Sequence, residues 1–520
     1  MKSLSTDRVV IIGAGLAALY AALALVPRPV LLVSPDPLGE GASSAWAQGG
    51  VAAAMDPSDS PEAHAQDTLV AGAGIVDQSV AESVTREARD HILNLTDLGA
   101  PFDRDATGAY LMSREAAHGF ARVVRVRGDR AGAEIMRALI AQVQTEPTIQ
   151  ILDGWTATGL SVSEGSVNGV ELAPVGGGAS VKISSASVLL AGGGAGGLYA
   201  LTTNPPRIRG QVSGLAARAG AMMADMEFVQ FHPTAMDIGL DPAPLATEAL
   251  RGEGAILRNN RGERFMEGQH PDLELAPRDV VARAVYAQSQ AGLRPVLDTR
   301  GALGARIKDE FPTVVAACER AEIDPVTQPI PVAAAAHYHM GGVATDMTGR
   351  TSIGGLWACG EVASTGLHGA NRLASNGLLE ALVYARRCAS DIAETVGDVP
   401  AAQRVEMPEV APAAEPDPDL IHRLRQAMTN GVGVIRTAEG LQAALREIAE
   451  IEAAQPDCVA LLNMTATATL IAASALKRQE SRGAHFRSDL PETDGPTGQR
   501  SRMTLTEALA LRDTFAKETI

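Results

Sequence analysis

Two glycines near the amino terminus, Gly13 and Gly15, lie where a run of apolar residues gives way to a helical pattern. A dinucleotide-binding turn needs glycine at such positions, because the chain turns tightly and a pyrophosphate must approach both the backbone and the helix N-terminus. Ala18 replaces the third glycine of the motif, which is an accepted variant. The spacing therefore indicates a site for a dinucleotide cofactor.

The glycine motif has two alternative interpretations. The acidic residue that usually ends the second strand is missing, because Ser34 stands there, so a glycine-rich surface turn is one alternative. A secretory signal is another, because Lys2 and Arg8 precede the apolar run of residues 9–26. Cleavage after that run would discard the glycine turn, which favours the nucleotide-binding interpretation. We expect no other run to reach the ~20 apolar residues that span a bilayer.

The elements that must position the turn indicate an α/β fold. Residues 8–34 predict a buried strand, a tight turn, a helix and a second strand, which together form a βαβ unit. Further signals that combine a strand with glycines occur at residues 187–194 and 355–361. We therefore expect a discontinuous cofactor domain over residues 1–225 and 339–405.

Two further regions complete the predicted organisation. Residues 226–338 are rich in His, Arg and Glu with mixed helix and loop character, and we interpret them as an inserted capping domain that holds the substrate. Residues 396–418 are rich in Pro, Ala and Glu, which is typical of a linker. Helical spacing over 424–451 and 461–476 predicts a C-terminal helical domain at 419–520.

The composition limits the possible partners. The 520 residues are 46% hydrophobic and carry a net charge of −17, which disfavours nucleic acid and anionic membranes as partners. An anionic substrate would therefore need local positive residues. The four cysteines, Cys318, Cys359, Cys388 and Cys458, show no C-x-x-C spacing. They signal neither a disulfide framework nor a metal site, and we expect a reducing cytoplasm.

A series of longer motifs extends over nearly the whole chain. They are Ser43–Gly50, Gln230–Pro233, Thr247–Glu248, Arg251–Gly254, Pro277–Asp279, His337–Gly342, Gly360–Glu361 and His368–Glu380. In this order they resemble the succinate dehydrogenase and fumarate reductase flavoprotein superfamily and, within it, the L-aspartate oxidase family. The resemblance implies a Rossmann-like α/β FAD-binding domain, interrupted by an α+β capping domain and followed by a C-terminal helical bundle.

The resemblance also implies which residues hold FAD, largely through the backbone. They are Gly13, Ala14, Gly15, Leu16, Ala17, Ser43, Ser44, Ala45, Trp46, Ala47, Gln48, Gly49, Gly50, Gln211, Glu361, Gly377 and Leu378. Two positions depart from the superfamily pattern. Gln211 stands where an acidic contact is usual, and an amide can still hydrogen-bond a ribose or an adenine. Ser43 stands where membrane-complex members link FAD through histidine, so we expect non-covalent FAD.

For the substrate, the resemblance implies a small dicarboxylate held by separate cationic and polar anchors, for which guanidinium groups are well suited. The expected anchors are Gln230, His232, Thr247, His337 and Arg372, with His339 a weaker candidate, and Glu248 supports the pocket as a catalytic group. Each has a structural alternative. A lone histidine can be a core residue, Thr247–Glu248 can begin a helix, and Arg372 can form a surface ion pair.

Two residues bear on the reaction itself. Arg278 resembles the superfamily's catalytic arginine, which acts either as a proton shuttle or as an electrostatic anchor, although guanidinium groups resist deprotonation. A shuttle would need tuning by carboxylates such as Glu248 or Glu253. Glu115 resembles the glutamate that orients aspartate in the aspartate oxidases, although Ala116 and Ala117 replace two glycines of that motif. An exposed acid at a helix start is the alternative for Glu115.

The resemblance implies oxidation of L-aspartate to iminoaspartate, with hydride passing from C2 to flavin N5 and then to O₂ or fumarate. The protein would position C2 and fix both carboxylates. By analogy, quinolinate synthase would take the product for de novo NAD synthesis. The alternatives are a soluble fumarate reductase or succinate dehydrogenase, and an electron-transfer subunit that needs an iron–sulfur partner.

Overall fold

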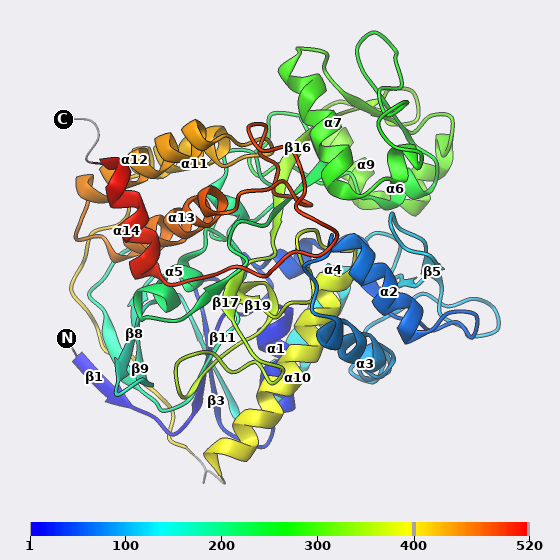
Figure 1. Ribbon diagram of the computed structural model, residues 1–520. Helices are drawn as coiled ribbons and strands as arrows, with labels where there is room; N and C mark the ends of the chain where they lie inside the picture. Colours follow the sequence, from blue (N-terminus) through cyan, green and yellow to red (C-terminus); the bar gives the residue numbers. More distant parts are fainter. Residues whose placement is uncertain (1, 398–401, 517–520) are drawn as a thin grey trace.

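The structure, a computed structural model, describes residues 2–397 and 402–516 (Figure 1). Its central sheet is parallel, in the order β18-β11-β2-β3-β7. Every residue of β2, β3, β11 and β18 is buried, as expected for Val- and Leu-rich strands whose two faces are both covered. The bounds are β2 Val9–Ile12, β3 Val30–Ser34, β7 Ile149–Asp153, β11 Val188–Leu190 and β18 Leu356–Ala358.

Helices α1 (Leu16–Ala24) and α10 (Asn376–Val396) pack against each other beside this sheet. Their apolar side chains share one core with those of α3 (Gln78–Asp97) and α4 (Ala131–Thr145). Because α1 starts directly after the glycine turn and α10 starts at residue 376, both helices begin next to predicted cofactor residues. The remaining elements of this part are α2 Pro61–Ala71, β4 Val51–Ala52, β5 Met112–Ser113 and β6 Val123–Val124.

A second sheet, in the order β1-β10-β9-β8, packs on the same domain and shares a core with α5 and the C-terminal helices. Its bounds are β1 Lys2–Ser5, β8 Trp155–Ser163, β9 Ser166–Pro174 and β10 Val181–Ser184, and α5 spans Gln211–Arg218. A small sheet in the order β19-β17-β12-β20 brings the end of the chain back to this domain. It contains β12 Met223–Ala224, β17 Gly342–Ala344, β19 Ala363–Ser364 and β20 Arg502–Met503.

The inserted segment forms a separate lobe with its own apolar core, green in Figure 1. Its sheet runs in the order β13-β16-β15-β14, and α7 packs on β13 and β16. Strands β13 and β16 also connect the lobe with the rest of the molecule. The bounds are β13 Val229–Met236, α6 Ala249–Gly252, β14 Ile256–Arg258, α7 Arg278–Gln290, β15 Val296–Asp298, α8 Ile307–Glu310, α9 Pro312–Arg320 and β16 Ile330–His339.

The C-terminal helices pack together, orange to red in Figure 1. They are α11 Pro418–Gly431, α12 Ala438–Ala454, α13 Val459–Lys477 and α14 Leu505–Ala516. Our expectation that no run beyond residues 9–26 reaches membrane-spanning length and composition was wrong, because α13 does. Scattered Thr and Ser residues interrupt its apolar runs without making it polar. The helix is mostly buried between α5, α12 and α14, as in the core of a folded domain.

The predicted fold class is confirmed: the parallel cofactor sheet, the interrupting lobe and the C-terminal helices are all present. Of the predicted linker 396–418, residues 398–401 lie outside the described residues. Residues 402–417 form neither helix nor strand, and they bond to the cofactor domain, for example where Gln150 and Val405 exchange two hydrogen bonds. The exact domain limits, 1–225 with 339–405, 226–338 and 419–520, stay a prediction.

Candidate active site

One cavity of about 1290 Å³ brings the predicted cofactor and substrate residues together. This volume exceeds the ~300–1,000 Å³ usual for ligand pockets, as a dinucleotide and a substrate side by side would require. Each of the predicted FAD residues, from Gly13 to Leu378, lines the cavity. Seven predicted substrate-site residues line it too: Glu115, His232, Thr247, Glu248, Arg278, His337 and Arg372. Gln230 lies behind this wall and touches it through hydrogen bonds.

The glycine turn is built so that a nucleotide can approach the backbone. Gly13 has φ +123°, and a Cβ at this residue would lie 2.2 Å from the carbonyl oxygen of Ala191 on the adjacent strand's end. Gly15 precedes the first turn of α1, whose N–H groups point outward and favour negative charge. Ser44 reaches the same place, because its Oγ accepts the Leu16 N–H at 3.1 Å.

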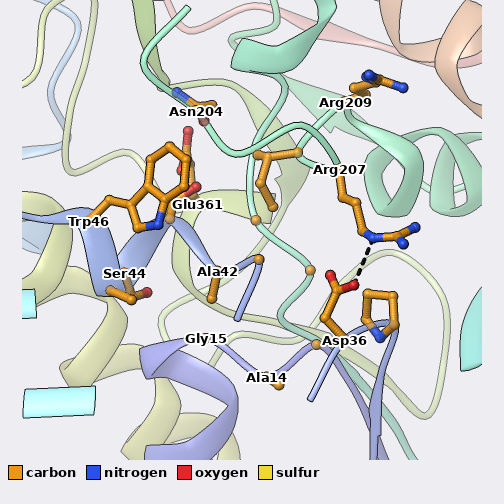
Figure 2. Close-up of a pocket in the computed structure, with 18 of the residues that line it drawn as sticks. Ala14, Gly15, Asp36, Ala42, Ser44, Trp46, Asn204, Arg207, Arg209 and Glu361 are labelled. Carbon is orange, nitrogen blue, oxygen red and sulfur yellow. Dashed lines mark hydrogen bonds and ion pairs between the residues drawn. The ribbon is translucent and has the colours of Figure 1, made fainter. Parts of the chain in front are cut away.

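The polar groups of this end fit FAD. Ser43 Oγ, Gln48 Oε1 and Asn204 Oδ1 are buried and have no hydrogen-bond partner among the described residues, and their residues line the cavity. Buried polar atoms normally have partners, so a bound polar ligand accounts for them. Ser44, Asn204 and Glu361 flank the opening above the glycine turn (Figure 2). These contacts, together with the glycine turn, support FAD as the cofactor.

The sequence analysis missed an ion pair at this end of the cavity. Asp36, two residues after β3, pairs with Arg207 at 2.9 Å, and both residues line the cavity (Figure 2). An acid is therefore present near the second strand, displaced by two residues from the expected Ser34. An acid two residues after a buried strand was the available signal, but the fixed spacing of the motif excluded it. Arg209 and Gln211 also line this wall.

Replacing Ser44 with alanine should weaken FAD binding about fivefold. The variant loses the Oγ that accepts the Leu16 N–H, and one such hydrogen bond contributes ~1 kcal/mol. Titration of the apoprotein with FAD, followed by quenching of flavin fluorescence, measures the effect. Ser58→Ala removes an exposed serine that bonds only Asp56 and serves as the control. Equal FAD affinities for the two variants would contradict this account.

At the other end, Arg278 is held from two sides. Its Nε donates to the Glu248 carboxylate, and its Nη1 donates to Gln230 Oε1 at 3.0 Å. Gln230 in turn donates to Asn371 Oδ1 at 3.0 Å and to the Arg372 carbonyl oxygen at 2.9 Å. The guanidinium therefore has a fixed orientation. The other predicted partner, Glu253, is exposed and pairs with Arg306 instead.

Glu248 is a buried carboxylate among cations. Burial raises its pKa, but Arg278 and Arg251 more than offset this effect and leave the pKa below its ordinary value. Its Oε1 accepts the Ala116 N–H at 3.0 Å. Although Glu248 directly precedes α6, its side chain does not cap that helix. The alternative of a helix start therefore does not explain this carboxylate.

The two histidines, His232 and His337, lie side by side, with ring centroids 5.0 Å apart. Burial, and then nearby arginines, hold the pKa of each well below its ordinary value, so both rings are neutral at pH 7. Thr203 Oγ1 contacts His337 Nδ1 at 2.8 Å, while His232 Nε2 is buried with no partner among the described residues. A neutral ring with a free nitrogen can donate a hydrogen bond to a carboxylate.

Arg372 is only 7% exposed, which excludes the alternative of a surface ion pair. Burial, followed by repulsion from Arg278, lowers its pKa to about 10, so it remains charged at neutral pH. Its Nε is buried without a partner among the described residues. With Arg278 it gives the cavity the local positive charge that an anion requires. His339, by contrast, contacts the Met226 carbonyl oxygen and does not line the cavity.

Glu115 is buried, at 3% exposure, in the loop after β5, which excludes an exposed acid at a helix start. Ser375 Oγ donates to its Oε2 at 2.9 Å, and Gly49 leaves room for its Oε1, because a Cβ there would lie 2.6 Å away. Burial, followed by the charge on Glu248, raises the pKa of Glu115 to about 7. The site thus holds a second carboxylate that changes its charge near neutral pH.

Comparisons with known proteins give the family. Residues 8–378 match the FAD binding domain family, and residues 456–514 match the fumarate reductase flavoprotein C-terminal family. The chain is 53% identical to the L-aspartate oxidase of Caulobacter vibrioides over 95% of this chain and 96% of that protein. It is 46% identical to the L-aspartate oxidase of Xylella fastidiosa over 97% and 96%.

A solved structure has the same fold. A mutant of the E. coli quinol fumarate reductase subunit FrdA superimposes with a TM-score of 0.85 and 29% identity, over 95% of this chain and 93% of that one. The shared fold, the FAD-binding match and the full-length identity to the Caulobacter and Xylella proteins agree. The chain belongs to the L-aspartate oxidase family of FAD-binding flavoproteins.

Proposed function

We propose that this protein oxidises L-aspartate to iminoaspartate and passes the two electrons to O₂, which gives H₂O₂, or to fumarate. FAD, when bound, supplies the two-electron acceptor for this reaction. The observation that carries the proposal is the position of Glu115, which shares one cavity with two arginines and two neutral histidines. Cationic anchors suit any dicarboxylate, whereas an additional carboxylate suits one that also carries an ammonium group.

Charged and neutral anchors together bind the two carboxylates of the substrate. Arg372 and Arg278 each offer a charged guanidinium to a carboxylate, while His232, His337 and Thr247 offer neutral donors. Because these groups come from β13, β16, α7 and the segments before α6 and α10, the substrate is held from several sides. In this proposal Arg278 acts as an electrostatic anchor, since Glu248 and Gln230 fix its orientation. Holding the substrate in one orientation contributes several kcal/mol to catalysis.

In this proposal Glu115 binds the amino group of the substrate. Its carboxylate orients the ammonium of L-aspartate and takes one of its protons, which a pKa near 7 allows. The nitrogen then has the free electron pair that a C=N bond requires, while C2 loses its hydrogen together with the bonding electrons. Water is kept from the imine, because the residues around the reacting end are largely buried.

A second candidate function is a soluble fumarate reductase or succinate dehydrogenase. The structural similarity to the E. coli fumarate reductase subunit, with a TM-score of 0.85, favours it, because the same anchors would serve succinate. Anaerobic addition of L-aspartate to the purified flavoprotein separates the two candidates. L-Aspartate should bleach the flavin absorbance within the dead time of hand mixing, and D-aspartate and succinate should not. Bleaching by succinate alone would favour the second candidate.

The protein works in the cytoplasm, which agrees with four cysteines that are all free and buried. Iminoaspartate is handed to quinolinate synthase for de novo NAD synthesis. The molecule divides into the FAD-binding, capping and helical domains with the limits that the sequence predicts.

Activity should depend on the ionisation of Glu115. Because its pKa is about 7, the carboxylate that holds the ammonium is lost as pH falls, and kcat/KM for L-aspartate should rise with pH between 6 and 8. Fumarate has no ammonium, so its reduction should lack this rise. Glu361, whose pKa burial also raises to about 7, would affect both reactions alike. Parallel pH profiles for the two reactions would argue against the assigned role of Glu115.

A further inference from the structure

The motif of residues 368–380 is closed at its two ends by a buried contact. His368 Nε2 lies 2.8 Å from Glu380 Oε2, and the two side chains are 4% and 1% exposed. Between these ends the chain carries Arg372, and also Ser375, which bonds Glu115. A contact that joins the two ends therefore limits the freedom of the segment that presents both groups to the cavity.

Tyr338 and Thr365 complete the contact. The Tyr338 hydroxyl donates to Glu380 Oε2 at 3.1 Å and lies 3.2 Å from His368 Nε2. Thr365 Oγ1 donates to the other carboxylate oxygen, Oε1, at 2.5 Å. Both oxygens of a buried carboxylate are thus satisfied by side chains from two separate segments, β16 and the loop that follows β19. Such a network restricts its members to one arrangement, although His368 Nδ1 is buried without a partner among the described residues.

The ring of Tyr338 connects this network with Arg372. The guanidinium carbon of Arg372 lies 4.5 Å from the centre of the ring, which is the geometry of a cation–π contact. Gly377 packs against the same ring, because a Cβ there would lie 3.0 Å from Tyr338 Cε2. Tyr338 also directly follows His337 on β16. It therefore joins the capping strand to the segment that carries Arg372.

Arg372 has few other contacts that could hold it. Its Nε is buried without a hydrogen-bond partner among the described residues, and no carboxylate of these residues lies within ion-pair distance of it. The guanidinium therefore stays available to a ligand. Its position depends on the ring beneath it and on the closed segment around it.

We propose that His368, Glu380 and Tyr338 form a positioning unit that fixes Arg372 for binding a dicarboxylate. This inference rests on the proposed function, because it assigns to Arg372 the role of a substrate anchor. His368 and Glu380 do not line the cavity and act through Arg372, and Tyr338, which does line it, presents its ring to the same guanidinium. Their loss should therefore weaken ligand binding while the flavin stays bound.

Two variants of Tyr338 separate the contribution of its hydroxyl from that of its ring. Tyr338→Phe keeps the ring and loses the hydroxyl, and fumarate should bind about fivefold more weakly, as expected for one or two lost hydrogen bonds. Tyr338→Leu loses the ring as well, and the loss should reach about fiftyfold. The dissociation constant of fumarate follows from its perturbation of the flavin absorbance. With L-aspartate, KM should rise in the same order while kcat changes less.

Tyr20→Phe is the matched control, because the Tyr20 hydroxyl also belongs to a polar cluster with a buried histidine, His91, and with Asn94 and Arg386, but Tyr20 does not line the cavity. It should leave the fumarate dissociation constant unchanged. Three outcomes would each overturn the positioning role. Tyr20→Phe could weaken fumarate binding as much as the Tyr338 variants do, or Tyr338→Leu could leave fumarate binding unchanged. The third outcome is loss of FAD in parallel with loss of fumarate. If the wild-type protein binds fumarate but does not oxidise L-aspartate, the proposed function fails while fumarate binding still tests the unit. Binding of neither ligand overturns both.

Discussion

Arg278→Lys should lower kcat for L-aspartate by about 10²- to 10³-fold, the cost usual for removing one fixed charge-stabilising donor. The Arg278 guanidinium contacts Glu248 through Nε and Gln230 through Nη1, so two donors fix its plane. A lysine ammonium keeps the charge but has no planar fork, and it cannot make both contacts and also face a substrate carboxylate. Steady-state kinetics on the FAD-loaded variant measures the change.

Arg283→Lys, on the same helix α7, is the control for Arg278→Lys. Arg283 pairs with Asp279 and bonds the Gly483 carbonyl oxygen, away from the cavity. This control should retain kcat within about twofold, since lysine keeps the positive charge of this partly buried pair and the pair lies outside the cavity. A fall in kcat of less than tenfold in Arg278→Lys would contradict the role of Arg278 as a fixed electrostatic anchor.

Glu115→Gln should change which ligand the site prefers. The variant loses the charge that holds the ammonium, and kcat/KM for L-aspartate should fall about 10²-fold, as expected when a buried hydrogen bond to a charged group is lost. Fumarate should bind at least as well, because a negative charge beside its carboxylates is gone. The rise in kcat/KM with pH between 6 and 8 should disappear. Kinetics with L-aspartate, together with fumarate binding, measures these changes.

Glu253→Gln is the matched control, since this exposed glutamate pairs with Arg306 outside the cavity. It should leave kcat/KM for L-aspartate and its pH dependence unchanged. If Glu115→Gln weakens L-aspartate and fumarate equally, then Glu115 supports the general structure of the pocket and does not select for an amino group.

A local motif was sufficient to predict the glycine turn at the cofactor end of the site, whereas the other FAD residues followed from the family resemblance. Gly13 and Gly15 can be recognised because a tight turn after a buried strand requires glycine whatever the rest of the chain does. Asp36 was missed because the motif allows only one spacing for the acidic residue. In the structure the acid lies two residues later, on the same wall of the cavity, and pairs with Arg207. The long resemblance, rather than local spacing, brought the distant substrate residues into one list.

Burial could not be read from the sequence at the substrate end. Whether Glu115 is an exposed acid or a carboxylate with a pKa near 7 depends on Gly49, Ser375 and Glu248, which are remote in the chain. The contact of His368 with Glu380 likewise depends on how the segment folds back before α10. Such properties arise from tertiary packing, and sequence patterns carry no signal for them.

Hydrogen peroxide release by the purified, FAD-loaded protein tests the central claim most directly. L-Aspartate in air should give one H₂O₂ for each iminoaspartate formed, while succinate, L-glutamate and D-aspartate should give none. That result would follow from two cationic anchors and one carboxylate acting on one amino-dicarboxylate. Absence of peroxide with L-aspartate, together with reduction of fumarate by an artificial donor, would contradict the account and leave a fumarate reductase.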